Sequence, residues 1–214
     1  MYCPAHFEEQ RTEVLLDLIE RHPLATIVSY GLAGLVANHI PLLHQPGESP
    51  HGKLIGHVAL GNPLWRAAPD QEHLLVFQGP ATYISPNWYA TKAKTGKVVP
   101  TWNYAVVHAY GKLVATRQPE AILAIINALT NRQEASQGHP WHVADAPKEY
   151  TVQLVSNIVG IEFQIVRLLG KWKVSQNQPE ENRQSVIDGL RSRQDQAASD
   201  MAGLVQKFGA ERQE

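Results

Sequence analysis

Cysteine is almost absent from this 214-residue sequence, which contains only Cys3. A single thiol excludes both a disulfide framework and a metal site built from thiolates. An excess of either charge is also missing, because 19 Lys and Arg residues face 20 Asp and Glu residues. The resulting net charge of −1 excludes a globally basic protein that holds polyanions without sequence preference.

An uninterrupted hydrophobic run is missing as well. Residues 22–47 contain no Asp, Glu, Lys or Arg, and that length would suffice for a membrane span. Pro23, Gly31 and Pro41 interrupt the segment, so two strands of a hairpin explain it better. The N-terminus carries acidic residues and no apolar core of a signal peptide. We therefore expect a cytoplasmic protein with no membrane partner.

The remaining pattern predicts a β-barrel with peripheral helices, which is an α+β fold. Strands are expected over 24–30, 35–43, 53–60, 73–78, 101–116 and 158–168, and helices over 8–21, 119–132, 147–157 and 179–208, with a break near Ser192. Gly79 and Pro80 are expected to end the fourth strand, and 81–101 to form a long aromatic loop. Regular alternation of strand and helix is lacking, which disfavours a doubly wound sheet.

The common catalytic and nucleotide-binding motifs are missing. The sequence has no Gly-x-Gly-x-x-Gly, no P-loop, no His-Glu-x-x-His and no nucleophile elbow around a serine. His139 and His142 have spacing that could share a metal, but no carboxylate or cysteine accompanies them, so no metal site is predicted. Cys3 is interpreted as an unreactive thiol.

Four polar and aromatic clusters stand out against this background. They lie at 38–41, at 56–65, at 97–104 and at 171–177. Together they supply aromatic planes, amides and cations, which a planar heteroaromatic ligand with a phosphate tail would use. Turns, edge strands and interface aromatics explain each cluster on its own better than ligand binding does. Residue types alone therefore leave ligand binding open.

Longer segments resemble a known family. These are MYCPAHF, HPLATIVSYGLAGLVANHIPL, GHVALGNPLWR, FQGPATYISPNWY, GKVVPTWNYAVVHAYGKL and VGIEFQIVRLLGKWKVSQNQPEENRQSVIDGLR. They resemble the PaiB family, described as FMN-binding negative transcriptional regulators, from Tyr2 to about Arg191. The resemblance implies an FMN-binding split barrel over 1–178, with an N-terminal helix and inserted helices, similar to the pyridoxamine-phosphate oxidase and flavin reductase group. Residues 179–214 are expected to form a C-terminal helical extension.

The resemblance also implies a homodimer with two FMN sites at its interface. The implied cofactor-binding residues are Asn38, His39 and Ile40 along the flavin, His57, Val58 and Asn62 near its phosphate, Trp102, Asn103 and Tyr104 from the partner subunit, and Lys171, Ser175, Gln176 and Asn177 in a closing segment. The resemblance assigns no catalytic residue. The related oxidases carry an Arg-Lys pair after the second of these strands, whereas this chain has only Arg66 there. His39, His57 and Lys171 could compensate. Gln178 stands where the family motif has a cation, which predicts weaker flavin binding.

Three functions fit these observations. The first is a PaiB-like FMN-binding regulator, the second a flavin-dependent oxidoreductase, and the third a split barrel that binds haem or another planar ligand. DNA binding is possible but unsupported by the charge pattern, since no helix-turn-helix or basic stripe is present. Lys92, Lys94 and Lys97 form the most basic stretch. We expect preference for FMN over FAD and weak, salt-sensitive DNA binding.

Overall fold

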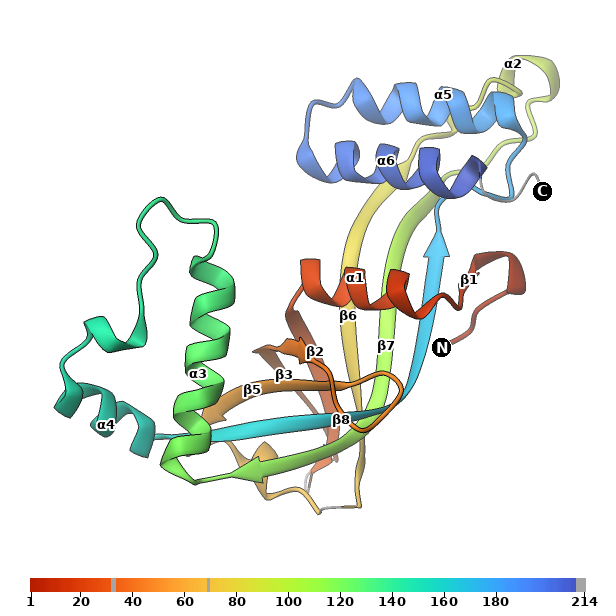
Figure 1. The fold of residues 1–214 in the computed structure, drawn as a ribbon. Coiled ribbons are helices and arrows are strands. Elements are labelled where there is room, and N and C mark those ends of the chain that lie inside the picture. The colour runs from red at the N-terminus through yellow and green to blue at the C-terminus, as the bar shows by residue number, and fades with distance from the viewer. Residues whose placement is uncertain (32–33, 69, 211–214) are drawn as a thin grey trace. The chain divides into compact units, whose positions relative to one another are not determined.

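The computed structural model describes residues 1–31, 34–68 and 70–210 (Figure 1). Its strands are β1 (Glu8–Glu9), β2 (Leu24–Gly31), β3 (Gly34–Pro41), β4 (Leu43–Gln45), β5 (Lys53–Ala59), β6 (Glu72–Ile84), β7 (Thr101–Thr116) and β8 (Ile158–Lys173). Its α-helices are α1 (Thr12–Arg21), α2 (Lys92–Thr95), α3 (Pro119–Glu134), α4 (Lys148–Ser156), α5 (Glu180–Arg191) and α6 (Gln196–Ala210). Short 3-10 helices are η1 (Ala5–Phe7), η2 (Pro63–Arg66), η3 (Pro86–Trp88) and η4 (Val143–Asp145).

The described strands form one sheet. Their order is β3-β2-β6-β7-β8-β5-β4, and β1 pairs with β8 beside this path. The pairs β2/β3, β2/β6, β4/β5, β5/β8 and β1/β8 are all antiparallel. An antiparallel sheet with helices is the predicted α+β fold class, which is thereby confirmed.

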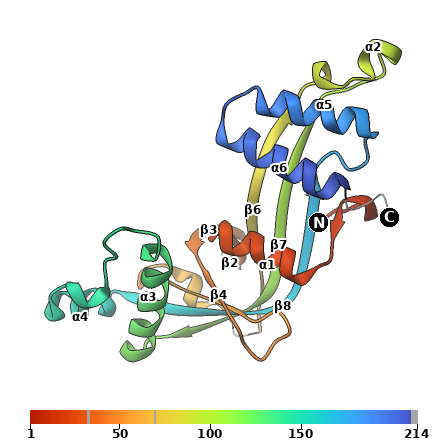
Figure 2. The ribbon, with the colours of Figure 1, turned by 45° about the horizontal axis from the view of Figure 1, so that its top comes forward.

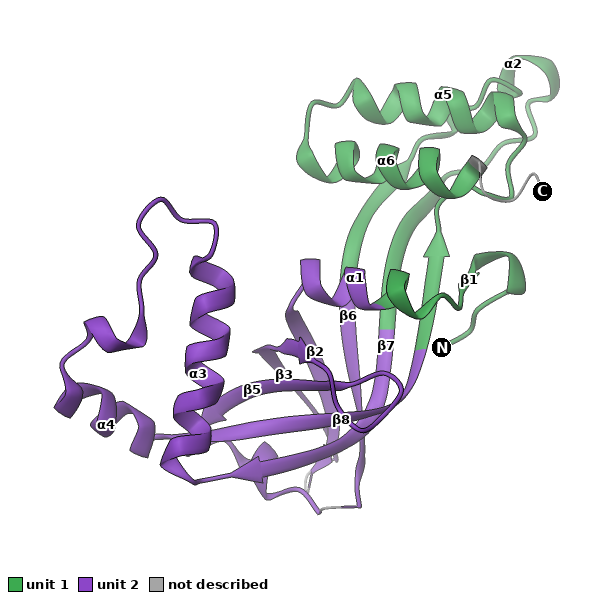
Figure 3. Cartoon of the chain, in the orientation of Figure 1, with its two compact units in different colours: residues 1–15, 78–107, 169–214 green, residues 16–77, 108–168 purple. Residues whose placement is uncertain are grey.

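Contacts divide the chain into two compact units (Figure 3). Unit 1 comprises residues 1–15, 78–107 and 169–214, and unit 2 comprises residues 16–77 and 108–168. The three long strands β6, β7 and β8 each have residues in both units. Because both units are assembled from separate chain segments, neither corresponds to one continuous stretch of sequence. The predicted boundary at residue 178 stays a prediction.

Unit 2 contains the β2/β3 hairpin, in which Ile27 faces Asn38 across the two strands. The two residues between Gly31 and Gly34, where a tight turn is expected, lie outside the described residues. Helix α3 packs on β8 at Gly160, where an added Cβ would lie 2.9 Å from the side chains of Thr116 and Ile125. Glycine therefore allows the helix to approach the strand closely.

Unit 1 contains the helical hairpin α5/α6, whose two helices lie side by side in both views (Figures 1 and 2). The hairpin buries an apolar face made of Val186, Ile187 and Leu190 from α5 and Met201, Ala202 and Val205 from α6. Trp88 of η3 lies against Gly189, where an added Cβ would come within 2.5 Å of the indole. The segment after β6 is thus attached to the hairpin.

The predicted elements are largely present, with two instructive differences. Strand β7 has the predicted bounds, and the predicted break near Ser192 separates α5 from α6. Strand β6, however, continues through Gly79 and Pro80 to Ile84. The prediction of a loop over 81–101 is therefore wrong, because β6 occupies the first of these residues and the rest contain η3 and α2. The alternation of buried residues shifts by one position at Pro80–Ala81, which is typical of a β-bulge rather than a strand end.

A second difference concerns the N-terminus. The helix predicted over 8–21 begins only at Thr12, because Glu8 and Glu9 pair with Lys171 and Gly170 of β8. Strand pairing with a distant segment overrides the local helical pattern here. Among the helices of the described residues, none is long and apolar enough to cross a membrane.

Candidate functional site

Unit 1 holds a polar pocket of about 500 Å³. It is lined by the start of β7, the end of β8, the segment before β7 and the start of α5, namely Tyr89, Thr91, Thr95, Lys97, Val98, Val99, Thr101, Asn103, Lys173, Ser175, Asn177, Gln178, Pro179 and Asn182. The predicted site residues Asn103, Ser175 and Asn177 are among them. None of these lining residues is acidic, so the pocket suits an anionic group.

Asn103 and Ser175 form the buried centre of this pocket. Asn103 is 1% exposed and Ser175 4% exposed, and the Asn103 Nδ2 donates a hydrogen bond to the Ser175 Oγ over 2.8 Å. Ser175 has a φ of 65°, a left-handed conformation that costs a residue other than glycine roughly 1 kcal/mol. Strain of this kind persists only where the surroundings impose it, and it concentrates at functional sites.

The turn that follows is closed by its own backbone and amides. The Gln176 Oε1 accepts a hydrogen bond from the backbone N–H of Val174, and the Gln176 Nε2 donates to the carbonyl of Trp172. The N–H of Gln178 donates to the carbonyl of Ser175 over 2.9 Å. Gln176 therefore holds the turn in place, while the exposed Asn177 side chain lines the pocket.

Several lysines of unit 1 have no carboxylate partner among the described residues, and they include the predicted Lys171 and the pocket residues Lys97 and Lys173. Lys173 donates to the carbonyl of Trp102 over 2.7 Å and to the hydroxyl of Thr101. Burial lowers the pKa of Lys173, and the charge of Lys171 lowers it further. Lys171 is buried, donates to the carbonyl of Tyr2 and lies 5.3 Å from the centre of the Tyr104 ring. Lys97 is exposed at the pocket. Lys97 and Lys173 line the same pocket, and two cations at a pocket without an acidic side chain favour a bound anion.

Strand β7 divides the predicted trio of Trp102, Asn103 and Tyr104. Successive side chains of a strand point to opposite faces, so Asn103 faces the pocket while Trp102 and Tyr104 face the other way. Trp102 is 58% exposed and contacts Tyr83 edge to face, with ring centres 6.3 Å apart. This exposed aromatic pair lies outside the pocket.

In unit 2, the predicted residues of β3 also point in two directions. The Asn38 Oδ1 accepts a hydrogen bond from the Asn62 Nδ2 over 2.8 Å. The Asn62 Oδ1 in turn accepts from the N–H of Leu64, so Asn62 caps η2. His39 lies on the opposite face, where its Nδ1 is 3.1 Å from the Thr26 hydroxyl, and Ile40 belongs to the core.

Strand β5 supplies His57 and Val58. Val58 is buried in the core. His57 is half-buried, and its Nδ1 has no hydrogen-bond partner among the described residues. Burial lowers the pKa of His57, so at neutral pH the imidazole supplies no positive charge to a phosphate. Arg66 of η2 is a cation of the same unit, and its guanidinium lies 4.8 Å from the centre of the Trp65 ring.

The predicted residues therefore form two groups, one in each unit. Asn38, His39, Ile40, His57, Val58 and Asn62 lie in unit 2, whereas Trp102, Asn103, Tyr104, Lys171, Ser175, Gln176 and Asn177 lie in unit 1. The sequence analysis did not single out Asn182. This 3% exposed residue donates to Thr91 Oγ1 and Gln178 Oε1 and accepts from the Thr91 N–H. Because Asn182 is one polar residue among many in this helix, the sequence does not indicate that it is buried and hydrogen-bonded at the pocket.

The donor set fits a flavin mononucleotide. A phosphate dianion requires cations without competing carboxylates, and Lys97 and Lys173 provide them at one pocket. The buried hydroxyl and amide of Ser175 and Asn103 suit a polyhydroxyl chain. Among the described residues, no group of three or more His, Cys, Asp or Glu side chains could hold a metal ion.

Comparison with solved structures identifies the fold. The chain resembles the flavocytochrome Anf3 of Azotobacter vinelandii, with a TM-score of 0.56 at 11% identity over 78% of this chain and 69% of that one. It also resembles an FAD and haem binding protein of Mycobacterium smegmatis, with a TM-score of 0.56 at 17% identity over 78% of this chain and 73% of that one. The fold is that of the flavin-binding split barrels.

Sequence similarity then identifies the family. Residues 1–167 match the family described as "Putative FMN-binding domain", and the chain belongs to that family. Protease synthase and sporulation protein PAI 2 of Bacillus subtilis is 31% identical over 96% of this chain and 97% of its own length. A protein of Emericella nidulans is 35% identical over 98% of both chains. The predicted resemblance to the PaiB family is confirmed.

Proposed function

We propose that this protein binds FMN and acts as a PaiB-like, flavin-dependent regulator. The observation that carries the proposal is the polar pocket of unit 1, in which Lys97 and Lys173 accompany the buried pair Asn103 and Ser175 without an acidic side chain. Membership of the FMN-binding family supports the same ligand. When bound, FMN would supply an isoalloxazine ring capable of accepting and donating electrons.

Within this proposal, the phosphate is met by Lys97 and Lys173. The resemblance instead implies that the phosphate lies near His57 and Asn62. Burial lowers the pKa of His57, however, and the Asn62 Oδ1 already accepts a hydrogen bond from the Leu64 N–H. Lys173 is already oriented by two hydrogen bonds, so it holds its charge in place before a ligand arrives. Such preorganisation reduces the entropy lost on binding.

A homodimer is part of the proposal. In unit 2, the hairpin exposes Tyr30, Leu35 and Val36, which are 71%, 75% and 41% accessible, and β3 is at one end of the strand order. An edge strand with exposed apolar side chains attracts a partner surface. In unit 1, Trp102 and Tyr83 are similarly exposed. A dimer mass by light scattering at micromolar concentration is expected, and a monomer mass would refute this part.

The ligand is tested by titrating the purified full chain with FMN, FAD and riboflavin while following flavin fluorescence. FMN should bind more tightly than FAD and riboflavin. Lys97→Met should weaken FMN about tenfold, as expected for one charge-assisted contact, and leave riboflavin unchanged because riboflavin lacks the phosphate. Lys112→Met removes the same charge from an exposed position outside the pocket and is the matched control. Equal losses of FMN affinity in K97M and K112M would contradict the assignment. A loss of FMN affinity in Arg66→Met, with none in K97M, would contradict it as well.

The regulatory role is separated from enzymatic activity by redox behaviour. The alternative function is a flavin-dependent oxidoreductase. The flavin of such an enzyme would be reduced by a nicotinamide donor and reoxidised by a substrate. The regulator we propose responds to flavin occupancy and does not depend on turnover. Because the net charge is −1, we place its action on a partner protein rather than on duplex DNA. Sub-micromolar, sequence-selective DNA binding near 150 mM salt would overturn that placement.

A further inference from the structure

A second pocket, formed wholly within unit 2, contains none of the predicted flavin residues. It has a volume of about 690 Å³ and lies between α3 and α4, with η4 and the start of β8 contributing to its lining. Its size falls within the range of about 300–1,000 Å³ that is typical of small-molecule sites. It is therefore large enough for a ligand of its own.

The lining of this pocket is mostly hydrocarbon. Leu123 of α3, Val143 of η4 and Val152 and Val155 of α4 contribute apolar side chains, and Ile158 completes the surface at the start of β8. Val152 is 60% exposed, although the α3 and α4 helices contact each other. Exposed aliphatic groups around a concave surface gain free energy when a ligand removes them from water.

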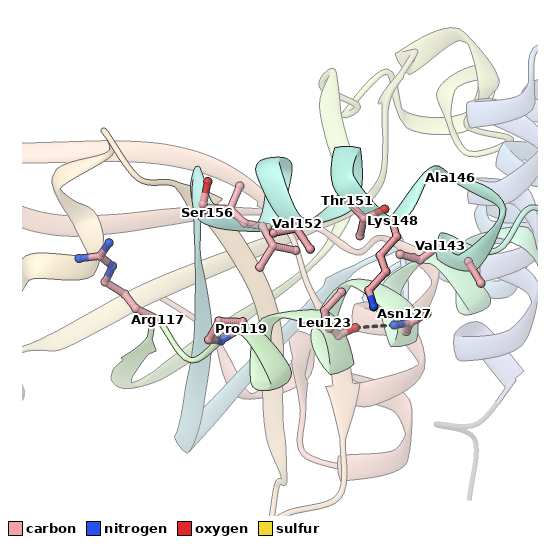
Figure 4. A pocket seen from close by; sticks show the side chains of 13 residues that line it. Arg117, Pro119, Leu123, Asn127, Val143, Ala146, Lys148, Thr151, Val152 and Ser156 are labelled. Atoms are coloured by element: carbon pink, nitrogen blue, oxygen red, sulfur yellow. Dashed lines mark hydrogen bonds between the residues drawn. The ribbon is translucent and has the colours of Figure 1, made fainter.

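One cation is directed at this apolar surface. Figure 4 shows the Lys148 side chain extending from the first residue of α4 toward Leu123 and Asn127 of α3. Lys148 has no hydrogen-bond or ion-pair partner among the described residues, and no described residue that lines the pocket is Asp or Glu. Arg117 also lines the pocket, but its guanidinium points away from Lys148 (Figure 4).

Two polar side chains, Asn127 and Thr151, line the pocket together with Lys148. The Asn127 Nδ2 donates one hydrogen bond to the carbonyl of Leu123 over 2.7 Å, which leaves its second N–H available. The Thr151 hydroxyl donates to the carbonyl of Pro147 and keeps its lone pairs. An ammonium group with an amide N–H beside it favours a carboxylate, and the aliphatic lining favours a hydrocarbon chain.

We propose that the pocket between α3 and α4 binds an amphipathic monocarboxylate, with the carboxylate at Lys148 and the hydrocarbon chain against Leu123, Val152 and Val155. Charge complementarity selects this occupant over a cationic or neutral amphiphile. The site is independent of the proposed flavin site, because none of its lining residues contributes to the pocket of unit 1.

The test uses sodium decanoate as the probe, titrated into the full chain by isothermal calorimetry. Saturable binding is expected, with affinity that falls by up to about fourfold for each methylene removed and with no dependence on added FMN. Decanol should bind more weakly than decanoate. If decanol binds equally well, or if FMN displaces decanoate, the proposal is overturned.

Three variants locate the contact. Lys148→Met keeps the length of the side chain and should weaken decanoate about tenfold while leaving decanol unchanged. Val152→Asp places a carboxylate in the apolar lining and should weaken decanoate further. Lys112→Met, with the same loss of charge elsewhere, should bind decanoate like the unmodified chain. Equal affinities for K148M and K112M would overturn the assignment. Failure to bind decanoate, together with a lower mass for V152D in light scattering, would show that a second copy of the chain occupies the pocket.

Discussion

The two units treat buried polar groups in opposite ways. In unit 1, the buried polar side chains Asn103, Ser175 and Asn182 are hydrogen-bonded to one another or to neighbours around one pocket. In unit 2, His73 is 1% exposed, and neither ring nitrogen has a hydrogen-bond partner among the described residues. His57 and His108 each have one such nitrogen as well.

Buried polar groups with hydrogen-bond partners and buried polar groups without them have different consequences. A satisfied network orients donors and acceptors, which a ligand then meets without reorganising them. A buried imidazole without partners costs free energy and resists protonation, because burial disfavours the charged form. The network of unit 1 thus forms a preorganised site, whereas the buried imidazoles of unit 2 make a contribution to stability that is lost at low pH.

The largest expected effect comes from breaking the satisfied network. Asn182→Ala removes three hydrogen bonds to Thr91 and Gln178, and at about 1 kcal/mol each the free energy of unfolding should fall by about 3 kcal/mol. Chemical denaturation measures the change. Asn177→Ala is the matched control, because Asn177 is exposed and its side chain has no hydrogen-bond partner among the described residues, so a loss below about 0.5 kcal/mol is expected. Equal losses would show that the network contributes nothing.

The next effect concerns the histidine without partners. Burial lowers the pKa of His73 below its unfolded value of about 6.5, so the unfolded chain binds more protons below that pH. The stabilisation is fully present above about pH 6.5 and is lost as the pH falls toward the folded pKa, by at most about 1.4 kcal/mol for this group at pH 5.5.

His73→Leu should remove this part of the loss. The difference in unfolding free energy between pH 7.5 and pH 5.5 should shrink in the variant, by at most about 1.4 kcal/mol. His139→Leu, which removes an exposed imidazole, should keep the pH dependence of the unmodified chain. If both variants lose stability equally between the two pH values, His73 is not the source.

Parts of this contrast could be predicted from the sequence. The run HLLVFQ indicates a buried strand and so predicts the burial of His73, and Asn62 before Pro63 predicts a helix cap. The hydrogen bond between Asn103 and Ser175 could not be predicted, because it joins residues 72 positions apart. The absence of partners for His73 likewise depends on distant neighbours. Strand alternation, by contrast, already implies that Trp102 and Asn103 cannot face the same ligand.

The smallest expected effect, a net change close to zero for Ser175→Gly, tests whether unit 1 also carries strain. Ser175→Ala removes the hydrogen bond from Asn103 and keeps the left-handed backbone, so the unfolding free energy should fall by about 1–2 kcal/mol. Ser175→Gly removes the same hydrogen bond but relieves a backbone cost of about 1 kcal/mol, so its net change should be close to zero. The comparison between the two variants isolates the strain, because both leave the Asn103 amide without its partner. FMN affinity should nevertheless fall in both, since both lose the hydroxyl that lines the pocket. If the glycine variant is as unstable as the alanine variant, the backbone at Ser175 is unstrained, and the hydrogen bond alone distinguishes the polar centre of unit 1 from the partnerless His73 of unit 2.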